Sequence, residues 1–250
     1  LDFMPDWASW EAELNRSGPW VGGFDLPFGL PRAWLQAQGW AAAEASEDVQ
    51  TWTAVMDRYA QTPKEQLKQA FKAYCDARPV GQKMAHRRTD GPAGSSPSMK
   101  WVNPPVAWMM HAGVPRLRRA GLHFPRLAAG DTRRVALEAY PGHLARLHLG
   151  HASYKSGDVR AQNPERQARR VQLLAQLETM GWVGLQLRCT AAVRAACVDD
   201  GRGDALDAVL CAMQAAWGAR AHALGDAYWG LPDCDPLEGW VVGVPDLPKK

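Results

Sequence analysis

Two aspartates in this sequence are spaced so that they can act together. Asp204 and Asp207 stand three residues apart at the start of a long apolar segment that we expect to be helical over residues 204–224. On a helix, residues three apart lie on the same face, so the two carboxylates point the same way. Such a pair is costly to bury unless a cation or a proton offsets the charge. A simpler alternative is that both acids favour the positive end of the helix dipole, with Asp204 as a cap.

Two more carboxylates follow short apolar runs with strand character. Asp25 stands near the end of residues 20–26, and Glu138 near the end of residues 133–139. In open α/β sheets, ligands bind beyond the carboxyl ends of the strands. The candidate metal ligands are therefore Asp25, Glu138, Asp204 and Asp207. This set contains carboxylates and neither His nor Cys, and such oxygen ligands suit Mg²⁺ or Mn²⁺. Two such ions about 4 Å apart can activate a water and stabilise the leaving oxygen of a phosphodiester.

Positive charge is concentrated in the middle of the chain. The whole sequence has a net charge of +3, but residues 78–170 hold 17 Lys and Arg against 5 Asp and Glu. This segment favours an anionic partner such as a nucleic acid. Arg87 and Arg88 lie in a long loop, residues 81–105, where guanidinium groups can clamp a phosphate, and Lys155 can add a further phosphate contact. The plainer alternative for all three is a solvated loop or surface residue.

Other residue types support less specific interpretations. The 12 tryptophans are scattered singly, and we expect most of them in the core and not as platforms for base stacking. His143 and His148 are five residues apart and lie on different faces of a helix, so we do not expect a zinc site with His151. Arg166, Arg169 and Arg170 form a basic stripe that is typical of a solvated helix face, and it would also suit a contact with a nucleic-acid backbone.

The elements that must position these residues are indicated by apolar periodicity and by Gly and Pro. Helices are predicted at residues 5–16, within 31–76, at 106–122 with interruptions at Gly113 and Pro115, at 164–180 and at 204–224. Strands are predicted at 20–26, 133–139 and 238–244, with a Tyr140-Pro141-Gly142 turn after the second strand.

Four runs in the chain are especially distinctive: GFDLPFGLP at 23–31, LEAYPG at 137–142, GDALDAVLCAMQAA at 203–216 and LEGWVVGVP at 237–245. In order and spacing they resemble the domain of unknown function 429 family (DUF429). That family is described as predicted nucleases with a ribonuclease H-like fold. The D-x-x-D-A pattern at 204–208 also resembles the last acidic motif of RuvC-type junction resolvases, which share the fold. The resemblance implies that Asp25, Glu138, Asp204 and Asp207 bind the metal.

The expected fold is therefore α/β, a single ribonuclease H-like domain over residues 1–250. Its mixed sheet would be flanked by helices, with a large helical and loop insertion at about residues 32–130. A fold of this type normally opens with a three-stranded hairpin meander whose first strand carries an essential Asp. No such strand precedes residues 5–16, and we expect the N-terminal strands to be missing from this chain.

The predicted function is that of a metal-dependent nuclease. Asp25, Glu138 and Asp207 would hold Mg²⁺ or Mn²⁺ and act in catalysis, Asp204 would assist as a metal ligand, and Arg87, Arg88 and Lys155 would bind phosphates. The rival is a non-catalytic nucleic-acid-binding or scaffold protein. A third alternative, an ATP-dependent phosphotransferase, rests on analogy of fold, and the sequence has no glycine-rich phosphate loop to support it.

Composition limits the class of protein. With 46% hydrophobic and 22% charged residues, the chain is neither collagen-like, disordered nor a coiled coil. The five cysteines form no C-x-x-C pair, which favours free thiols in a reducing compartment and hence a cytoplasmic protein. No stretch approaches 18 apolar residues, so no membrane partner is expected.

Overall fold

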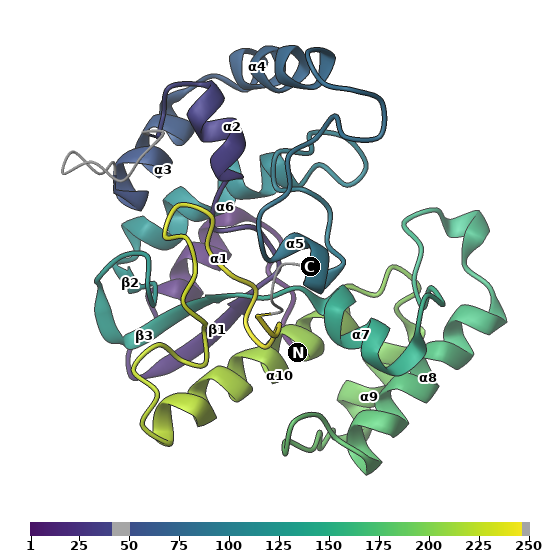
Figure 1. The fold of residues 1–250 in the computed structure, drawn as a ribbon. Coiled ribbons are helices and arrows are strands. Elements are labelled where there is room, and N and C mark those ends of the chain that lie inside the picture. The colour runs from purple at the N-terminus through teal and green to yellow at the C-terminus, as the bar shows by residue number, and fades with distance from the viewer. Residues whose placement is uncertain (42–50, 247–250) are drawn as a thin grey trace.

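The computed structural model describes residues 1–41 and 51–246 (Figure 1). Within them the chain forms ten α-helices, one 3-10 helix and three strands. In chain order they are α1 Trp7–Leu14, β1 Trp20–Phe24, α2 Arg32–Ala37, α3 Trp52–Gln61, α4 Lys64–Asp76, α5 Asp90–Ala93, α6 Val106–Arg119, β2 Leu122–His123, β3 Asp131–Glu138, α7 Pro141–Leu149, η1 Val159–Ala161, α8 Pro164–Thr179, α9 Ala191–Asp199 and α10 Asp204–Ala223.

The sheet of the described residues is small and parallel, with strand order β1-β3-β2. The predicted strands at 20–26 and 133–139 are confirmed as β1 and β3, which pair from Trp20 with Arg134 to Phe24 with Glu138. The α/β class is therefore correct. The mixed sheet is not what the described residues show, because both strand pairings run in the same direction.

Helices flank both faces of this sheet. Alternation along β1 and β3 places Val21 and Leu137 on one face, whereas Trp20 and Phe24 lie on the other. The face of Trp20 and Phe24 joins the hydrophobic core built with α2, α3, α4 and α6, which lie in the upper half of Figure 1. The opposite face is crossed by α10, which also packs against α7 and α9.

A glycine sets how closely α10 approaches the sheet. A Cβ on Gly23 of β1 would lie 2.3 Å from the backbone oxygen of Cys211 in α10. A larger residue at this position would force the helix and the strand apart. Gly23 therefore allows the end of β1 to lie directly against the segment of α10 that carries Asp207.

The predicted interruption of the helix at 106–122 is wrong, because α6 runs continuously from Val106 to Arg119. Pro115 is accommodated inside the helix. Gly113 serves packing and not chain reversal, since a Cβ there would lie 2.6 Å from Leu26 Cδ2. The loop at 81–105 is confirmed apart from the short α5, and the part of the predicted helical region at 42–50 lies outside the described residues.

Two further predictions are corrected. Pro141 does not form a turn with Tyr140 and Gly142 but occupies the first position of α7, where the absent N–H costs no hydrogen bond. Residues 238–244 are not a strand, because Gly239 and Gly243 have positive φ and turn the chain. One link to the sheet remains, from the Val242 N–H to the Glu138 carbonyl at 2.8 Å.

Several other local predictions are confirmed. The helices predicted at 164–180 and 204–224 correspond to α8 and α10. All five cysteines are free thiols. Within the described ranges, no helix has the length and apolar character needed to cross a membrane.

Candidate functional site

Two predicted acids that are far apart in the sequence, Asp25 and Asp207, line one pocket. Asp25 directly follows β1, and Asp207 projects from the first turns of α10. Both line a pocket of about 630 Å³ between α1, β1, α6 and α10. Asp25 also lines an adjoining pocket of about 280 Å³, so this carboxylate stands where the two cavities meet.

The charge of Asp25 is disfavoured by its surroundings. Its side chain is accessible from the pocket, but the protein around it limits hydration. This desolvation, reinforced by the nearby Asp207, raises the pKa of Asp25 to about 7. Glu138 adds to the shift, whereas Lys155 opposes it. The two aspartates therefore interact electrostatically, as closely placed carboxylates do.

Asp207 is held by two neighbours from the loop between α7 and η1. The Tyr154 hydroxyl donates to Asp207 Oδ1 at 2.5 Å, and the Lys155 ammonium forms an ion pair with Oδ2. Although burial works in the opposite direction, the Asp207 carboxylate raises the pKa of Lys155. Gly203 makes this contact possible, because a Cβ there would lie 2.7 Å from Lys155 Cβ.

Asp204 is placed differently from Asp207. Gly203, not Asp204, occupies the N-cap position of α10, and the side chain of Asp200 accepts the Ala205 N–H at 2.9 Å. Asp204 lines the larger pocket, but its side chain is 63% exposed and has a long contact of 3.7 Å to Arg202. It lies on the rim of the pocket, so its predicted part as a metal ligand remains a prediction.

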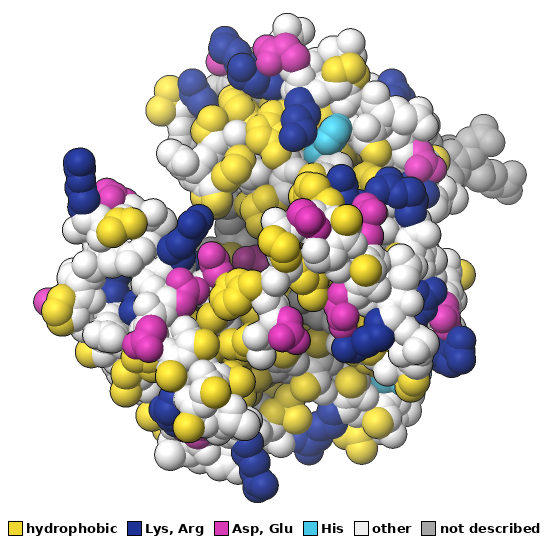
Figure 2. Space-filling model, turned by 180° about the vertical axis from the view of Figure 1, so that it is seen from behind, with side chains coloured by type: hydrophobic (Ala, Val, Ile, Leu, Met, Phe, Trp, Pro, Cys, Tyr) yellow, Lys and Arg dark blue, Asp and Glu magenta, His cyan; other side chains and the backbone are white. Residues whose placement is uncertain are grey.

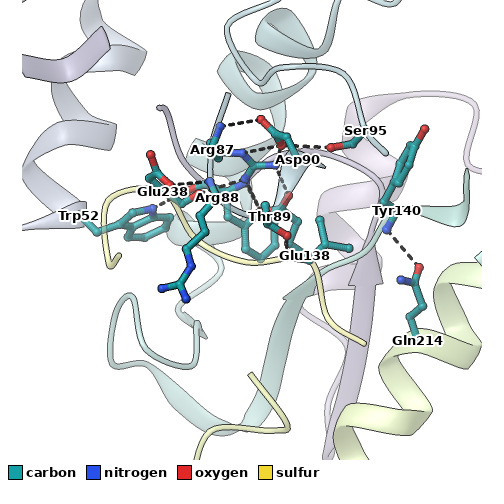
Figure 3. A network of polar contacts seen from close by, with 12 residues as sticks. Trp52, Arg87, Arg88, Thr89, Asp90, Ser95, Glu138, Tyr140, Gln214 and Glu238 are labelled. Carbon is teal, nitrogen blue, oxygen red and sulfur yellow. Dashed lines mark hydrogen bonds and ion pairs between the residues drawn. The ribbon is translucent and has the colours of Figure 1, made fainter. Parts of the chain in front are cut away.

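Glu138 belongs to a second network of charges (Figure 3), and with Arg87 it lines the adjoining pocket of about 280 Å³ that Asp25 and Lys155 also line. The Arg87 guanidinium forms bonds of 2.7 and 2.8 Å to the two oxygens of Glu138, and it also binds Asp90 and the Glu238 carbonyl. The side chains of Arg87 and Glu138 are only 1% and 3% exposed. Glu138 also accepts the Phe28 N–H at 2.8 Å.

This network leaves Arg87 no free N–H for a phosphate, because its Nε, Nη1 and Nη2 groups all donate to protein oxygens. In this arrangement Arg87 joins β3 to the 81–105 loop and to the C-terminal segment. The expectation that Arg87 clamps a phosphate and Glu138 a metal does not fit these contacts. Sequence reasoning missed the partners Asp90 and Glu238, because nothing local marks them as buried.

The other predicted basic residues are largely occupied by nearby acids. Arg88 pairs with Asp246, and its side chain is 40% exposed. Further arginines of the basic middle segment pair in the same way: Arg116 and Arg119 with Glu11, Arg118 with Asp57, Arg126 with Asp233, and Arg133 and Arg134 with Asp131. The excess positive charge of residues 78–170 is therefore partly neutralised by acids, several of them from other parts of the chain.

A hollow on one face of the molecule gathers acidic and hydrophobic side chains, between the part that carries α4 and the part that carries α8 and α9 (Figure 2). Although most tryptophans were expected in the core, the hydrophobic lining of the larger pocket includes three of them: Trp7, Trp10 and Trp108. Trp34, Trp40, Trp52, Trp182, Trp229 and Trp240 are buried as expected. Trp7, in contrast, is 49% exposed.

The pocket holds carboxylate oxygens, the ligand type that hard divalent cations prefer. Among the described residues, no group of three or more His, Cys, Asp and Glu is close enough to hold a metal ion. Magnesium, however, commonly uses one or two carboxylates and completes its shell with waters and substrate phosphates. Asp25 and Asp207 are two carboxylates that line one pocket, and each Asp207 oxygen also has a protein partner, Tyr154 on Oδ1 and Lys155 on Oδ2.

A protein-family model matches most of the chain, including the elements that form the pocket. The model of the family described as "Protein of unknown function (DUF429)" matches residues 6–233, which include β1, β3, α10 and the pocket between them. The chain belongs to DUF429. No curated protein and no solved structure matches it. The resemblance to DUF429 is thus confirmed, and three of the four sequence runs, at 23–31, 137–142 and 203–216, lie within the matched residues.

Proposed function

We propose that this DUF429 protein is a metal-dependent nuclease that hydrolyses phosphodiester bonds in the pocket lined by Asp25 and Asp207. The observation that carries the proposal is the meeting of these two carboxylates at the carboxyl end of a parallel strand. This is where open α/β sheets bind ligands. A parallel pair of strands crossed by a helix that bears a carboxylate is also compatible with a ribonuclease H-like fold, which we include in the proposal.

Asp25 and Asp207 would hold Mg²⁺ or Mn²⁺ in this function. When bound, such an ion supplies a Lewis acid that activates water and stabilises the leaving oxygen. Tyr154 and Lys155 fix the Asp207 side chain through its two oxygens, so that it does not have to be ordered when substrate arrives. Lys155 also lines the adjoining pocket beside Asp25, where its ammonium would bind a phosphate oxygen of the substrate.

The proposal retains the remaining residues in more limited parts. Asp204 on the rim would contact the metal through water, and Arg88, which is accessible, would bind a phosphate away from the pocket. Glu138 and Arg87 would act as the scaffold beneath Asp25. The free cysteines fit a reducing, cytoplasmic location.

The direct test is cleavage of labelled DNA and RNA, single-stranded, duplex and branched, with Mg²⁺, with Mn²⁺ and with EDTA. Asp207→Asn should lower metal-dependent cleavage on the order of 100-fold or more, because it removes a charged metal ligand. It should also weaken Mn²⁺ binding measured by electron paramagnetic resonance. Asp233→Asn is the matched control, since this side chain is 99% exposed and pairs only at the surface with Arg126.

The outcomes separate this proposal from its rivals. Unchanged metal-dependent cleavage by Asp207→Asn would show that the carboxylate pair is not the active site. Salt-sensitive binding of nucleic acid without any metal-dependent cleavage would instead favour a non-catalytic binding or scaffold protein. Transfer of phosphate from ATP to a small molecule would favour a phosphotransferase.

A further inference from the structure

The pocket that holds the carboxylate pair has a second wall of a different character. Trp7 and Trp10 of α1, together with Trp108 and Met109 of α6, line the same cavity as Asp25 and Asp207. Trp7 and Met109 are 49% and 37% exposed, so this wall presents large apolar side chains to solvent. A second cavity, lined by residues 4–7 and Trp10, continues from this wall through the same two tryptophans.

The indole rings of this wall are accompanied by positive charge. The Arg116 guanidinium lies 4.2 Å from the centre of the Trp7 ring, and the Lys64 ammonium lies 5.8 Å from the centre of the Trp108 ring. Arg116 also forms an ion pair with Glu11, at 3.0 Å, whereas Lys64 is exposed to solvent. Each cation lies over one face of its indole ring, so a nucleotide base would stack on the other face while a phosphate of the same strand contacts the cation.

We infer that Trp7 and Trp108 stack unpaired nucleobases, so that the substrate class of this site is single-stranded nucleic acid. The inference rests on the proposed function, because it takes the scissile phosphate to be the one at Asp25 and Asp207. The cavity of about 630 Å³ falls in the range of about 300–1,000 Å³ that is usual for small-ligand sites, large enough for a nucleotide.

Duplex nucleic acid does not fit the same wall. In a duplex, neighbouring base pairs cover both faces of each base, so stacking on Trp7 would first require the base to leave the helix. An unpaired base has free faces and makes this contact without that cost. The chemistry is common to DNA and RNA, since every base has a flat aromatic face. The wall therefore selects for the absence of pairing and not for the sugar.

Fluorescence anisotropy of labelled oligothymidylate and oligouridylate measures this binding in EDTA and again with Ca²⁺. Trp7→Ala should weaken binding about tenfold, as is usual for the loss of one stacking residue. Trp7→Leu should weaken it to a similar extent, because leucine keeps an apolar side chain beside Trp10 but has no flat ring. Trp7→Phe should restore most of the affinity. Unlabelled duplex of the same length should compete poorly.

Tyr228→Ala is the matched control. Tyr228 is also exposed, at 47%, and also lies under an arginine, with Arg126 3.8 Å from its ring centre, but it does not line this pocket. Its loss should leave binding unchanged. Equal affinity of Trp7→Ala, Trp7→Leu and the natural chain for single strands would overturn the inference, as would equal binding of duplex.

The two proposals can fail separately. If Trp7 variants lose single-strand binding while Asp207→Asn leaves cleavage unchanged, base stacking on Trp7 is supported and the nuclease assignment is wrong. If cleavage depends on Asp207 but neither Trp7→Leu nor Trp108→Leu alters single-strand binding, the nuclease assignment is supported and the inference of base stacking on these tryptophans is wrong.

Discussion

Replacement of Arg87 by Met should strongly destabilise the protein, because Arg87 neutralises two buried carboxylates. Its guanidinium binds Glu138 at 2.7 and 2.8 Å and Asp90 at 2.9 and 3.1 Å, and all three side chains are at most 3% exposed. Met fills a similar volume but carries no charge, so both acids would remain buried without their cation. Removing one member of a buried ion pair costs about 3–5 kcal/mol.

Urea denaturation at pH 7 measures this loss, and thermal unfolding should show it as well. In a chain of this size the thermal midpoint changes by about 2–4 °C for each kcal/mol, so it should fall by roughly 6–20 °C. Arg88→Met is the neighbouring control, since Arg88 is 40% exposed and pairs with Asp246 at the surface, where an ion pair contributes about 0–1 kcal/mol.

A second variant tests the cause of the effect. Glu138→Gln combined with Arg87→Met removes a carboxylate as well as the cation, and should be less destabilising than the sum of the two single changes. A loss of under about 1 kcal/mol in Arg87→Met, or strict additivity in the double variant, would refute the view that the Arg87 charge supports this part of the core.

Two further changes probe the pocket and its packing. Asp25 has a folded-state pKa of about 7 against about 3.8 when unfolded, so its contribution to stability is full below about pH 4 and is lost as pH rises to about 7. The stability of Asp25→Asn relative to the natural chain should therefore increase between pH 4.5 and pH 8, and only modestly because Asp25 is accessible. If the difference in urea midpoint between the two proteins is the same at both pH values, or decreases, this reasoning is contradicted. Gly23→Ala should cost about 1–3 kcal/mol, since its Cβ would lie 2.3 Å from the Cys211 oxygen. Gly91→Ala, where the added Cβ meets nothing within 4 Å, is the control, and equal urea midpoints for the two variants would show that α10 can yield at this contact.

Local sequence patterns predicted the elements that carry the site. Residues 164–179 have Asn163 as a side-chain cap and Pro164 in the first helical position, and both signals act within one turn of chain. Asp204 and Asp207 do lie in the first turns of α10, and Asp25 and Glu138 do lie at or just after the ends of two neighbouring parallel strands. These are consequences of period and of turn residues, which the sequence shows directly.

Errors arose where a local pattern was overridden by packing. The apolar run at 238–244 has strand composition, but positive φ at Gly239 and Gly243 turns it into a buried strap beside Glu138. Gly113 suggested a helix break, whereas its role is to admit the Leu26 side chain against α6. A glycine can serve a turn or a close contact, and its neighbours in space decide between them.

The sequence by itself determined that four acids would stand at strand ends and on one helix, and that the charge would be uneven. Tertiary structure alone decided their partners. Arg87 reaches Glu138 across 51 residues of sequence, and Lys155 reaches Asp207 across 52. These contacts join a buried scaffold at Glu138 and a cleft at Asp207, and they depend on how distant segments pack. Local periodicity reports only which face a side chain occupies, so it carries no information about which distant charge that face will meet.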